Sequence, residues 1–330
     1  MADISVAEQM NSIPQRADAV RKGGARDVRF YYLTLAAALL VLAIFGGVMT
    51  ALIVGSLPAI KAYGLPFVWT ETWNPVTEKF GALAPIYGTL VTSILAMVVA
   101  VPVGIGIAIF LTEICPRSLR RVIGIAIELL AGVPSIIYGI WGLFVFAPWF
   151  QEHVQTPIVD AVANIPYLQD YLGGPPYGIG LFTSALILSI MVLPFISAVT
   201  RDVFETVPSM LKEAAYGLGC TTWEVMWRVV LPFARAGVVG GAMLALGRAL
   251  GETMAVTFVI GNAHHIHKSL FAPATTISAT IANEFTEAVG DLYLSSLIEL
   301  GLILFFITFV VLAAAQLMLR ALERRAGSAS

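Results

Sequence analysis

Six long apolar blocks separated by polar segments set the pattern of this 330-residue chain. Each block can cross about 30 Å of hydrocarbon as a helix, which takes roughly 20 residues. None alternates in polarity as a barrel strand would, and in lipid only helices or closed barrels satisfy the backbone. We therefore predict an all-α polytopic membrane protein with six transmembrane helices, at 31–57, 85–112, 122–148, 179–200, 236–260 and 292–319.

Charge supports this class and orients the chain. Only 12% of the residues are charged, against about 25% in soluble domains. Fifteen of the 19 lysines and arginines fall in the N-terminal tail (1–30), in 117–121, in 201–235 and in the C-terminal tail (320–330), whereas the opposite side holds Lys61, Lys79 and Lys268. The positive-inside rule then predicts that both termini are cytoplasmic.

The same pattern divides the chain. The N-terminal tail (1–30) is expected to be mobile or to lie on the surface, with a short interfacial helix as the alternative. The first transmembrane helix (31–57) follows too long a polar segment to be a cleaved signal peptide. A periplasmic loop (58–84) precedes the core permease domain (85–319), which contains five transmembrane helices and a cytoplasmic loop at 201–235.

The outer loops carry aromatic and histidine side chains. Aromatic residues in 58–84 and 149–178 are expected to anchor at the membrane interface; they are Trp69, Trp73, Trp149, Tyr167, Tyr171 and Tyr177. His264, His265 and His267 invite a metal hypothesis, but a fourth ligand is missing and a solvated loop is favoured. The segment 261–291 is rich in small and hydroxylated residues and is expected to dip toward the membrane. Cys115 and Cys220 fall on the cytoplasmic side, where thiols stay reduced, so neither a disulfide nor a metal site is predicted.

The cytoplasmic loop 201–235 has a specific local pattern. Pro208 suits the first turn of a helix, Gly219 can end it, and Thr221 with Glu224 fits a capping box for the next helix. Apolar residues then recur at helical spacing, as a stripe that can fill a groove on a partner protein: Trp223, Met226, Trp227 and Val230. The alternative is an amphipathic helix that packs on its own bundle.

This loop resembles the EAA loop of ABC importer permeases. That pattern is Glu-Ala-Ala, three residues, Gly, nine residues, Ile, one residue and Leu-Pro, and the chain departs from it only at Val229. The resemblance implies that the loop docks on an ATPase subunit, with coupling residues Glu213, Ala214, Ala215, Gly219, Leu231 and Pro232. The chain has no phosphate-cradling Gly-x4-Gly-Lys-Ser/Thr motif of its own.

Arg248 and Glu252 are charged residues within the fifth apolar block. Four residues apart on one helix they can pair, and at about 1.5 Å per residue Arg248 lies about 18 Å into the span. An uncompensated charge there costs at least about 2.5–3.5 kcal/mol, so the pair should face a cavity or a partner. Arg248 could attract a passing oxyanion while Glu252 holds it and limits binding; a purely structural pair is the alternative.

Proline and small residues mark further positions inside the membrane. Pro134 removes a backbone donor and should leave the Leu130 carbonyl unpaired, unless Ser135, water or a neighbour compensates. A kink that lines the pathway and a simple packing kink both fit. Glu128 is either a cavity group or the partner of a basic residue on another chain. Gly104 with Ala108 suits close helix packing.

Three stretches are similar to the PstC-type permeases of the phosphate-specific transport system: 101–108, 134–139 and 247–253. The match runs from about residue 80 to 318. It implies a type I ABC importer permease-like fold, with Arg248 and Glu252 linked to phosphate translocation and Ser135 and Glu128 as further candidates. Asn283 and Glu284 also resemble a family segment, without an assigned role.

We therefore predict a multi-pass permease subunit, in the bacterial inner membrane, of an ATP-driven importer of inorganic phosphate. The resemblance implies three partners: a second, PstA-like permease, a dimer of PstB-like ATP-binding subunits and a PstS-like periplasmic binding protein. No nucleic acid partner is expected. The chain is expected to be no enzyme and to hold no cofactor, because the ATP is used by the partner. The alternatives are the same machinery for sulfate or molybdate, an ion-driven secondary anion transporter, and a membrane phosphate sensor.

Overall fold

The computed structural model describes the backbone of residues 3–327 and the side chains of residues 27–320, except Arg117 and Pro166. Throughout this part the regular structure is helical, and the only β pairing consists of two isolated bridges. Five helices among these residues are long and apolar enough to cross a membrane, or up to six if one bent pair counts as one span. The predicted all-α polytopic fold is confirmed.

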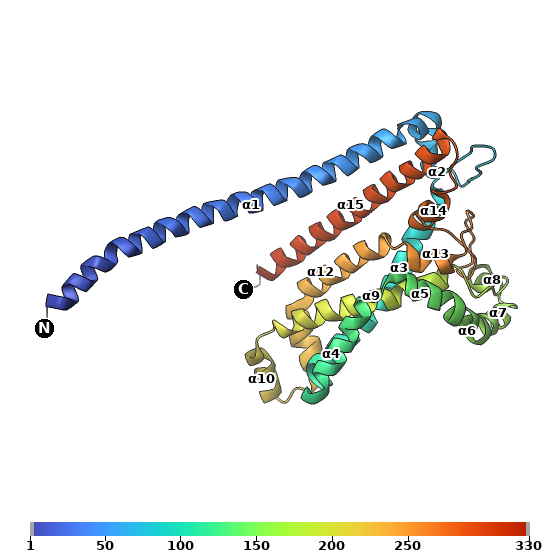
Figure 1. The fold of residues 1–330 in the computed structure, drawn as a ribbon. Helices are drawn as coiled ribbons and strands as arrows, with labels where there is room; N and C mark the ends of the chain where they lie inside the picture. Colours follow the sequence, from blue (N-terminus) through green and yellow to red (C-terminus); the bar gives the residue numbers. More distant parts are fainter. Residues whose placement is uncertain (1–2, 328–330) are drawn as a thin grey trace. The chain divides into compact units, whose positions relative to one another are not determined.

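Contacts divide the chain into two units, Met1–Val54 and Gly55–Ser330. The first unit belongs to a single helix, α1 (Asp3–Tyr63) (Figure 1). The predicted N-terminal tail is therefore helical from Asp3 onward, while Met1 and Ala2 lie outside the described residues. Large apolar side chains of this unit, such as Leu40 and Val41, are exposed in the isolated chain, as a lipid-facing helix requires.

The second unit follows α1 with short and long helices, four of them π-helical turns labelled η. In chain order they are α2 (Pro66–Trp69), α3 (Leu83–Ile109), η1 (Phe110–Ile114), α4 (Arg117–Ala131), α5 (Ser135–Trp141), η2 (Gly142–Phe146), α6 (Ala147–Phe150), η3 (Gln151–Gln155), α7 (Thr156–Val162), α8 (Pro166–Leu172), α9 (Leu181–Glu205), α10 (Ser209–Gly217), α11 (Thr222–Val225), η4 (Met226–Val230), α12 (Leu231–Leu250), α13 (Met254–Ile260), α14 (Ile277–Glu284) and α15 (Asp291–Gly327).

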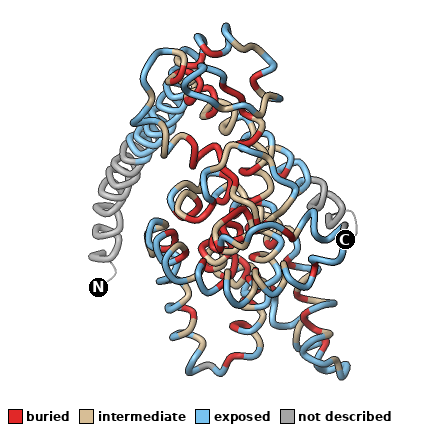
Figure 2. Tube along the Cα trace, turned by 90° about the vertical axis from the view of Figure 1, so that its right-hand side faces the viewer, coloured by how far each residue is buried: buried red, intermediate tan, exposed pale blue. Residues whose placement is uncertain are grey.

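Small residues bring the central helices together. A Cβ at Gly104 on α3 would lie 2.6 Å from Ile196 Cγ2 on α9, and one at Gly241 on α12 would lie 2.6 Å from Val199 Cγ1. Glycine at these positions lets the helices approach closely, as is common between membrane helices. The packing role predicted for Gly104 is confirmed. Buried positions concentrate around these contacts in the middle of the bundle (Figure 2).

The third predicted span, 122–148, is broken rather than continuous. α4 ends at Ala131, and the chain turns by 89° before α5 begins. Pro134 lies at this break because it supplies no backbone N–H and cannot continue a helix. The Leu130 carbonyl is not left unpaired: it accepts hydrogen bonds from the Tyr138 hydroxyl at 2.8 Å and from the Val133 N–H at 3.2 Å. The predicted kink is therefore confirmed, as a break between two helices within the predicted span.

The part of the chain after this break is more helical than the sequence suggested. Helical turns continue from Ser135 to Val162, and α8 follows. The segment 149–178, predicted as a loop, is thus helical over most of its length. Within the second unit, Figure 1 shows α6, α7 and α8 at one end and α10 at the other.

The fifth predicted span, 236–260, is also interrupted. α12 ends at Leu250, with Gly251 as its C-cap, and α13 begins at Met254. The break itself is Gly251-Glu252-Thr253, but apolar residues resume directly afterwards in α13, so the pattern of hydrophobic positions did not reveal it.

The segment before α14 folds back into the bundle. Thr275 and Thr276 are 1% and 4% exposed, and the Ile277 N–H donates to Thr89 Oγ1 on α3 at 2.9 Å. A Cβ at Gly88 would overlap the Thr275 carbonyl. The segment is therefore packed into the bundle, while its expected dip toward the membrane stays a prediction.

Candidate functional site

The EAA-like residues lie in a coupling segment, defined here as residues 208–232, at the α10 end of the molecule (Figure 1). α10 ends at Gly217, and Gly219 follows with a φ of +83°. A Cβ at Gly219 would meet nothing within 4 Å. Its backbone conformation, rather than close packing, therefore favours glycine at this turn.

The second helix of the coupling segment starts with the predicted capping box. The Thr221 hydroxyl accepts from the Glu224 N–H at 3.4 Å, and the Glu224 carboxylate accepts from the Thr221 N–H at 2.9 Å. Two backbone donors at the start of α11 are thereby satisfied. This local prediction is confirmed.

The apolar residues of the coupling segment divide into an inward and an outward face. Val225, Met226 and Val230 are buried against the ends of α3 and α9, in one cluster with Ala215. Trp223 and Trp227 instead stack on each other with ring centroids 5.3 Å apart, and both are more than half exposed. The single stripe predicted for Trp223, Met226, Trp227 and Val230 is therefore wrong. The π-helical turn η4 changes the angular spacing of its side chains.

The other predicted coupling residues also divide between the two faces. Glu213 and Ala214 are exposed on α10, whereas Ala215 is buried. Leu231 is half-buried and Pro232 exposed, both in the first turn of α12. One face of the loop packs on its own bundle, as the second interpretation expected, while the other face is exposed in this chain, and its docking on a partner stays a prediction.

The two helix breaks are brought together by α5 and α13. A Cβ at Gly139 would lie 2.8 Å from the Met254 carbonyl oxygen and 3.3 Å from the Ala255 Cα. The start of α13 therefore packs directly on α5, whose first residue is Ser135. Ser135 is half-buried at this break.

Arg248 lies just before the second break, and Glu252 lies within it. Arg248 is exposed in the last turn of α12, while the Glu252 carboxylate accepts a hydrogen bond from the Ala255 N–H at 3.3 Å. Neither residue takes part in an ion pair within 4.0 Å among residues whose side chains are described. The predicted pairing is wrong, because α12 ends at Leu250 and Glu252 leaves its helical register.

Glu128 has a partner within the same chain. Its carboxylate lies 2.8 Å from Arg201 Nη2 on α9, and Arg201 also contacts Asp202 at 3.0 Å. A cavity of about 310 Å³ is lined by this pair together with Arg120, Arg121, Gly124, Ile125 and Glu205. Of the two predicted environments the structure gives the cavity group, with its basic partner on α9 rather than on another chain. Arg201 was not among the predicted site residues.

Comparison with known proteins identifies the family. The family described as "Binding-protein-dependent transport system inner membrane component" matches residues 100–328. A phosphate transport system permease protein PstC from Mesorhizobium japonicum is 64% identical over 98% of this chain and 99% of its own length. A protein of the same name from Pasteurella multocida is 56% identical over 91% of this chain and 94% of its own. This chain belongs to the PstC family.

A solved structure supports the fold of this PstC-family chain. The crystal structure of a bacterial alginate ABC transporter, in complex with a periplasmic protein bound to alginate pentasaccharide, contains a chain with a TM-score of 0.60 and 19% identity. The match covers 90% of this chain and 96% of that chain. The fold is that of a type I ABC importer permease, and the PstC-family chain is a multi-pass transport subunit.

A cluster near the α8 end of this PstC-family permease was not predicted. The Glu284 carboxylate accepts from Trp73 Nε1 at 2.6 Å and from the Tyr293 hydroxyl at 2.7 Å, and lies 2.8 Å from His264 Nε2. The His264 and Trp73 rings stack at 5.3 Å. We call these four residues the Glu284 hub. Trp73 and His264 therefore contact each other and Glu284, and the prediction of a solvated histidine is wrong for His264, whose side chain is 19% exposed.

Burial and the neighbouring polar groups shift the pKa of the Glu284 carboxyl in opposite directions. Burial alone raises the pKa of its carboxyl, but the hydrogen bonds from His264, Tyr293 and Trp73 and the charge of His264 outweigh burial, so the pKa lies below its ordinary value. The neighbouring histidine makes a similar contact: His265 Nδ1 lies 2.6 Å from Glu71 Oε1. The Ile266 N–H and His265 lower the pKa of Glu71.

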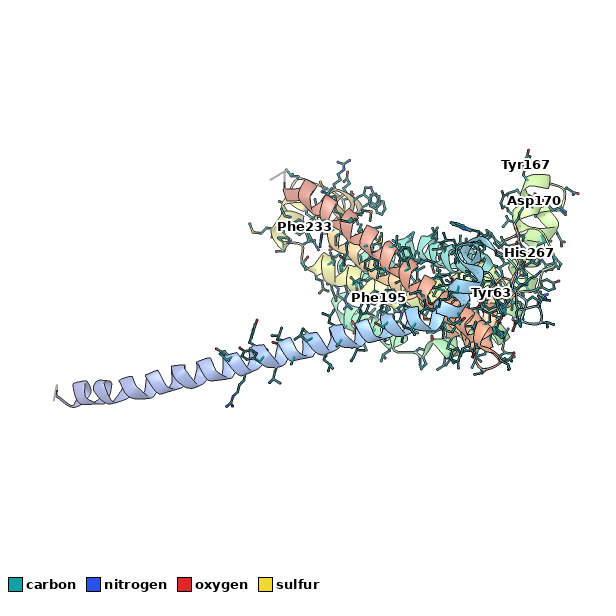
Figure 3. The ribbon with its side chains drawn as sticks, turned by 90° about the horizontal axis from the view of Figure 1, so that it is seen from above. Tyr63, Tyr167, Asp170, Phe195, Phe233 and His267 are labelled. Atoms are coloured by element: carbon teal, nitrogen blue, oxygen red, sulfur yellow. The ribbon has the colours of Figure 1, made fainter. Side chains whose placement is uncertain are left out.

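His264 and His265 therefore connect the segment before α14 to Glu284 at the end of α14 and to Glu71 after α2. Within the second unit, His267, Asp170 and Tyr167 lie at one end and Phe233 lies toward the other (Figure 3). Among the described residues no group of three or more metal-ligating side chains is gathered. In the sequence, the only indication of the Glu284 hub was the resemblance of Asn283 and Glu284 to a family segment. That resemblance did not indicate which residues contact Glu284.

Proposed function

We propose that this chain is one of two permease subunits of an ATP-driven importer that carries inorganic phosphate across the bacterial inner membrane. The near full-length similarity to PstC phosphate permeases carries the proposal. The α10 end would be cytoplasmic and the α8 end periplasmic. This orientation agrees with the concentration of arginine near 117–121 and in 201–235.

ATP would be hydrolysed by a dimer of separate, PstB-like subunits docked on the outward face of the coupling segment. That face offers the stacked Trp223 and Trp227, the exposed Glu213 and the highly exposed Leu218. Large aromatic side chains set among polar ones are suited to a protein interface. The chain itself would need no cofactor for this role.

A PstS-like binding protein would deliver phosphate at the α8 end, into a pathway shared with a PstA-like permease. Exposed apolar side chains on α4, such as Val122 and Leu129 at 63% and 69%, must be covered by lipid or by that second subunit. Movement of packed helix groups around a midplane site would then open the pathway to alternate sides.

Arg248 would supply the cation that attracts the oxyanion near the middle of the pathway. Because Glu252 caps the start of α13 instead of pairing with it, the Arg248 guanidinium keeps its charge and its planar donors available. Ser135, at the break next to α13, could offer a hydroxyl to the same path. Glu128, held by Arg201, would limit how tightly an anion binds farther along.

Uptake of labelled phosphate and of labelled sulfate at limiting concentrations tests the proposal. Cells that lack this chain should lose phosphate uptake and keep sulfate uptake; loss of sulfate uptake alone would overturn the phosphate cargo. Uptake that survives loss of the ATPase partners would indicate an ion-driven transporter, and unchanged uptake without this chain would favour a sensor.

Substitutions on α12 test the role proposed for Arg248. Arg248→Gln should lower phosphate uptake at least about ten-fold. Arg235→Gln is the matched control, because Arg235 is exposed on the same helix and lies outside the proposed path. Full uptake by an assembled Arg248→Gln complex would remove Arg248 from the mechanism.

A further inference from the structure

Lys212 and Glu113 form an ion pair at the junction between the coupling segment and α3. Lys212 Nζ, on α10, lies 2.6 Å from Glu113 Oε1 on η1. The two side chains are only 18% and 11% exposed, and the residues are 99 positions apart in the sequence. The predicted coupling residues include neither of them.

The burial of this pair makes it different from an ordinary surface ion pair. Exposed pairs hold their partners weakly, because water competes for both charges. A mostly buried lysine or glutamate that loses its partner leaves an uncompensated charge in the protein interior, where charges are poorly solvated. The charged groups of Lys212 and Glu113 therefore strongly favour remaining in contact. The junction therefore resists being pulled apart.

The pair works beside an apolar contact between the same elements. Ala215, one turn after Lys212 on α10, is buried in one cluster with Ala108 of α3 and Phe204 of α9. Glu213, the residue next to Lys212, is exposed. Adjacent residues of α10 thus face different directions, with Glu213 exposed and Lys212 bound to the bundle.

Contacts continue from Glu113 into α4. Arg120 Nη2, in the first turns of α4, donates to the Thr112 carbonyl at 2.5 Å, and Thr112 precedes Glu113 in the same π-helical turn. α4 then runs to the break before α5, where Ser135 lies. A displacement of α10 that moves Glu113 is therefore passed to the helix that ends at this break.

We propose that the Lys212–Glu113 ion pair, here called the strut, transmits movement of α10 to η1, the turn between α3 and α4. Through α4 this movement would reach the break between α4 and α5. This inference rests on the proposed function, since it names how ATPase closure would reach the pathway. Both are positioning residues, because they act through the helices they join. A pair that only helped the chain to fold would not change how much phosphate moves for each ATP hydrolysed.

The test uses the complete importer, reconstituted in proteoliposomes with its binding protein, and measures both phosphate transported and ATP hydrolysed. Lys212→Glu and Glu113→Lys should each lower the ratio of phosphate to ATP at least about ten-fold. The double variant, which restores opposite charges, should recover most of the ratio. Arg320→Glu on α15 is the control charge reversal, because Arg320 is exposed and lies outside both the coupling segment and the α8 end; it should leave the ratio unchanged.

Each result separates the two proposals. A wild-type complex that transports no phosphate would contradict the proposed function. A wild-type complex that transports phosphate, with single variants that keep its ratio, would overturn the strut, as would a double variant no better than the single ones. If the reversed charges prevent assembly, Glu113→Gln takes their place; it should lower the ratio as well, and an unchanged ratio would overturn the strut.

Discussion

Arg201 on α9 reaches Glu128 on α4 across a glycine. The two charged groups are 2.8 Å apart, and a Cβ at Gly124 would lie 3.1 Å from Arg201 Nη1. The small residue leaves room for the guanidinium to lie over α4. The contact ties α9 to α4 one turn before the helix break that ends α4 at Ala131.

A double-mutant cycle should measure this contact. Arg201→Gln and Glu128→Gln are expected to show a coupling energy of about 1 kcal/mol in the free energy of unfolding. The value is modest because the Glu128 side chain is half exposed. Asp202→Asn is the control, since its carboxylate is more exposed and should contribute less. Equal effects of Glu128→Gln in the presence and absence of Arg201 would contradict an energetic link between the two residues.

Gly219→Ala should strain the turn of the coupling segment. At a φ of +83° an alanine side chain clashes with its own backbone, at a cost of about 1–2 kcal/mol. Gly217→Ala is a matched control two residues earlier: it is helical, its Cβ would meet nothing within 4 Å, and alanine is the better helix former. Amide hydrogen exchange in α10 should accelerate only in the Gly219 variant. Unchanged exchange there would show that the turn tolerates a side chain.

The Glu284 hub should loosen in acid. Because folding lowers the pKa of Glu284 below its ordinary value of 4.5, its contribution to stability is fully present above that pH. It is lost as the pH falls through the lowered pKa. The fluorescence difference between wild type and Trp73→Phe reports the Trp73 environment and should change in that acidic range.

Two variants assign this change to Glu284. Glu284→Gln should abolish the acid-dependent fluorescence change, because it removes the titrating carboxylate. Glu287→Gln should preserve it, since Glu287 is exposed and lies outside the hub. The same acid transition in Glu284→Gln and wild type would assign the titration to another group.

The sequence predicted the number and type of spans better than their continuity. Pro134 indicated the break between α4 and α5, because proline cannot donate the backbone hydrogen bond that a helix needs. Nothing comparable announced the second break, since apolar residues continue through Met254–Ile260 and the spacing of Arg248 and Glu252 fits an unbroken helix. That break coincides with the close approach of α13 to Gly139, a tertiary contact that hydrophobic periodicity does not contain.

Local features of the site were predicted and distant ones were not. The Thr221 capping box joins residues three positions apart, so its pattern is visible in the sequence. The partners of Lys212 and His264 are 99 and 20 positions away, and their pairing depends on which helices meet. Trp73 lies 211 positions from Glu284. Its aromatic character predicted an interfacial anchor, but a hydrogen bond over this separation could not be read from the sequence.

Because the coupling segment has a buried face and an exposed face, its exposed residues can be exchanged without changing the buried ones. A graft limited to Glu213, Trp223 and Trp227 would replace side chains exposed to a foreign ATPase and keep the contacts that fold this chain. Transplanting the whole segment from another permease would also bring new side chains against Glu113 and Ala108, which have to fit them. Chimeric importers should therefore tolerate exchange of the outward residues more readily than exchange of the complete loop.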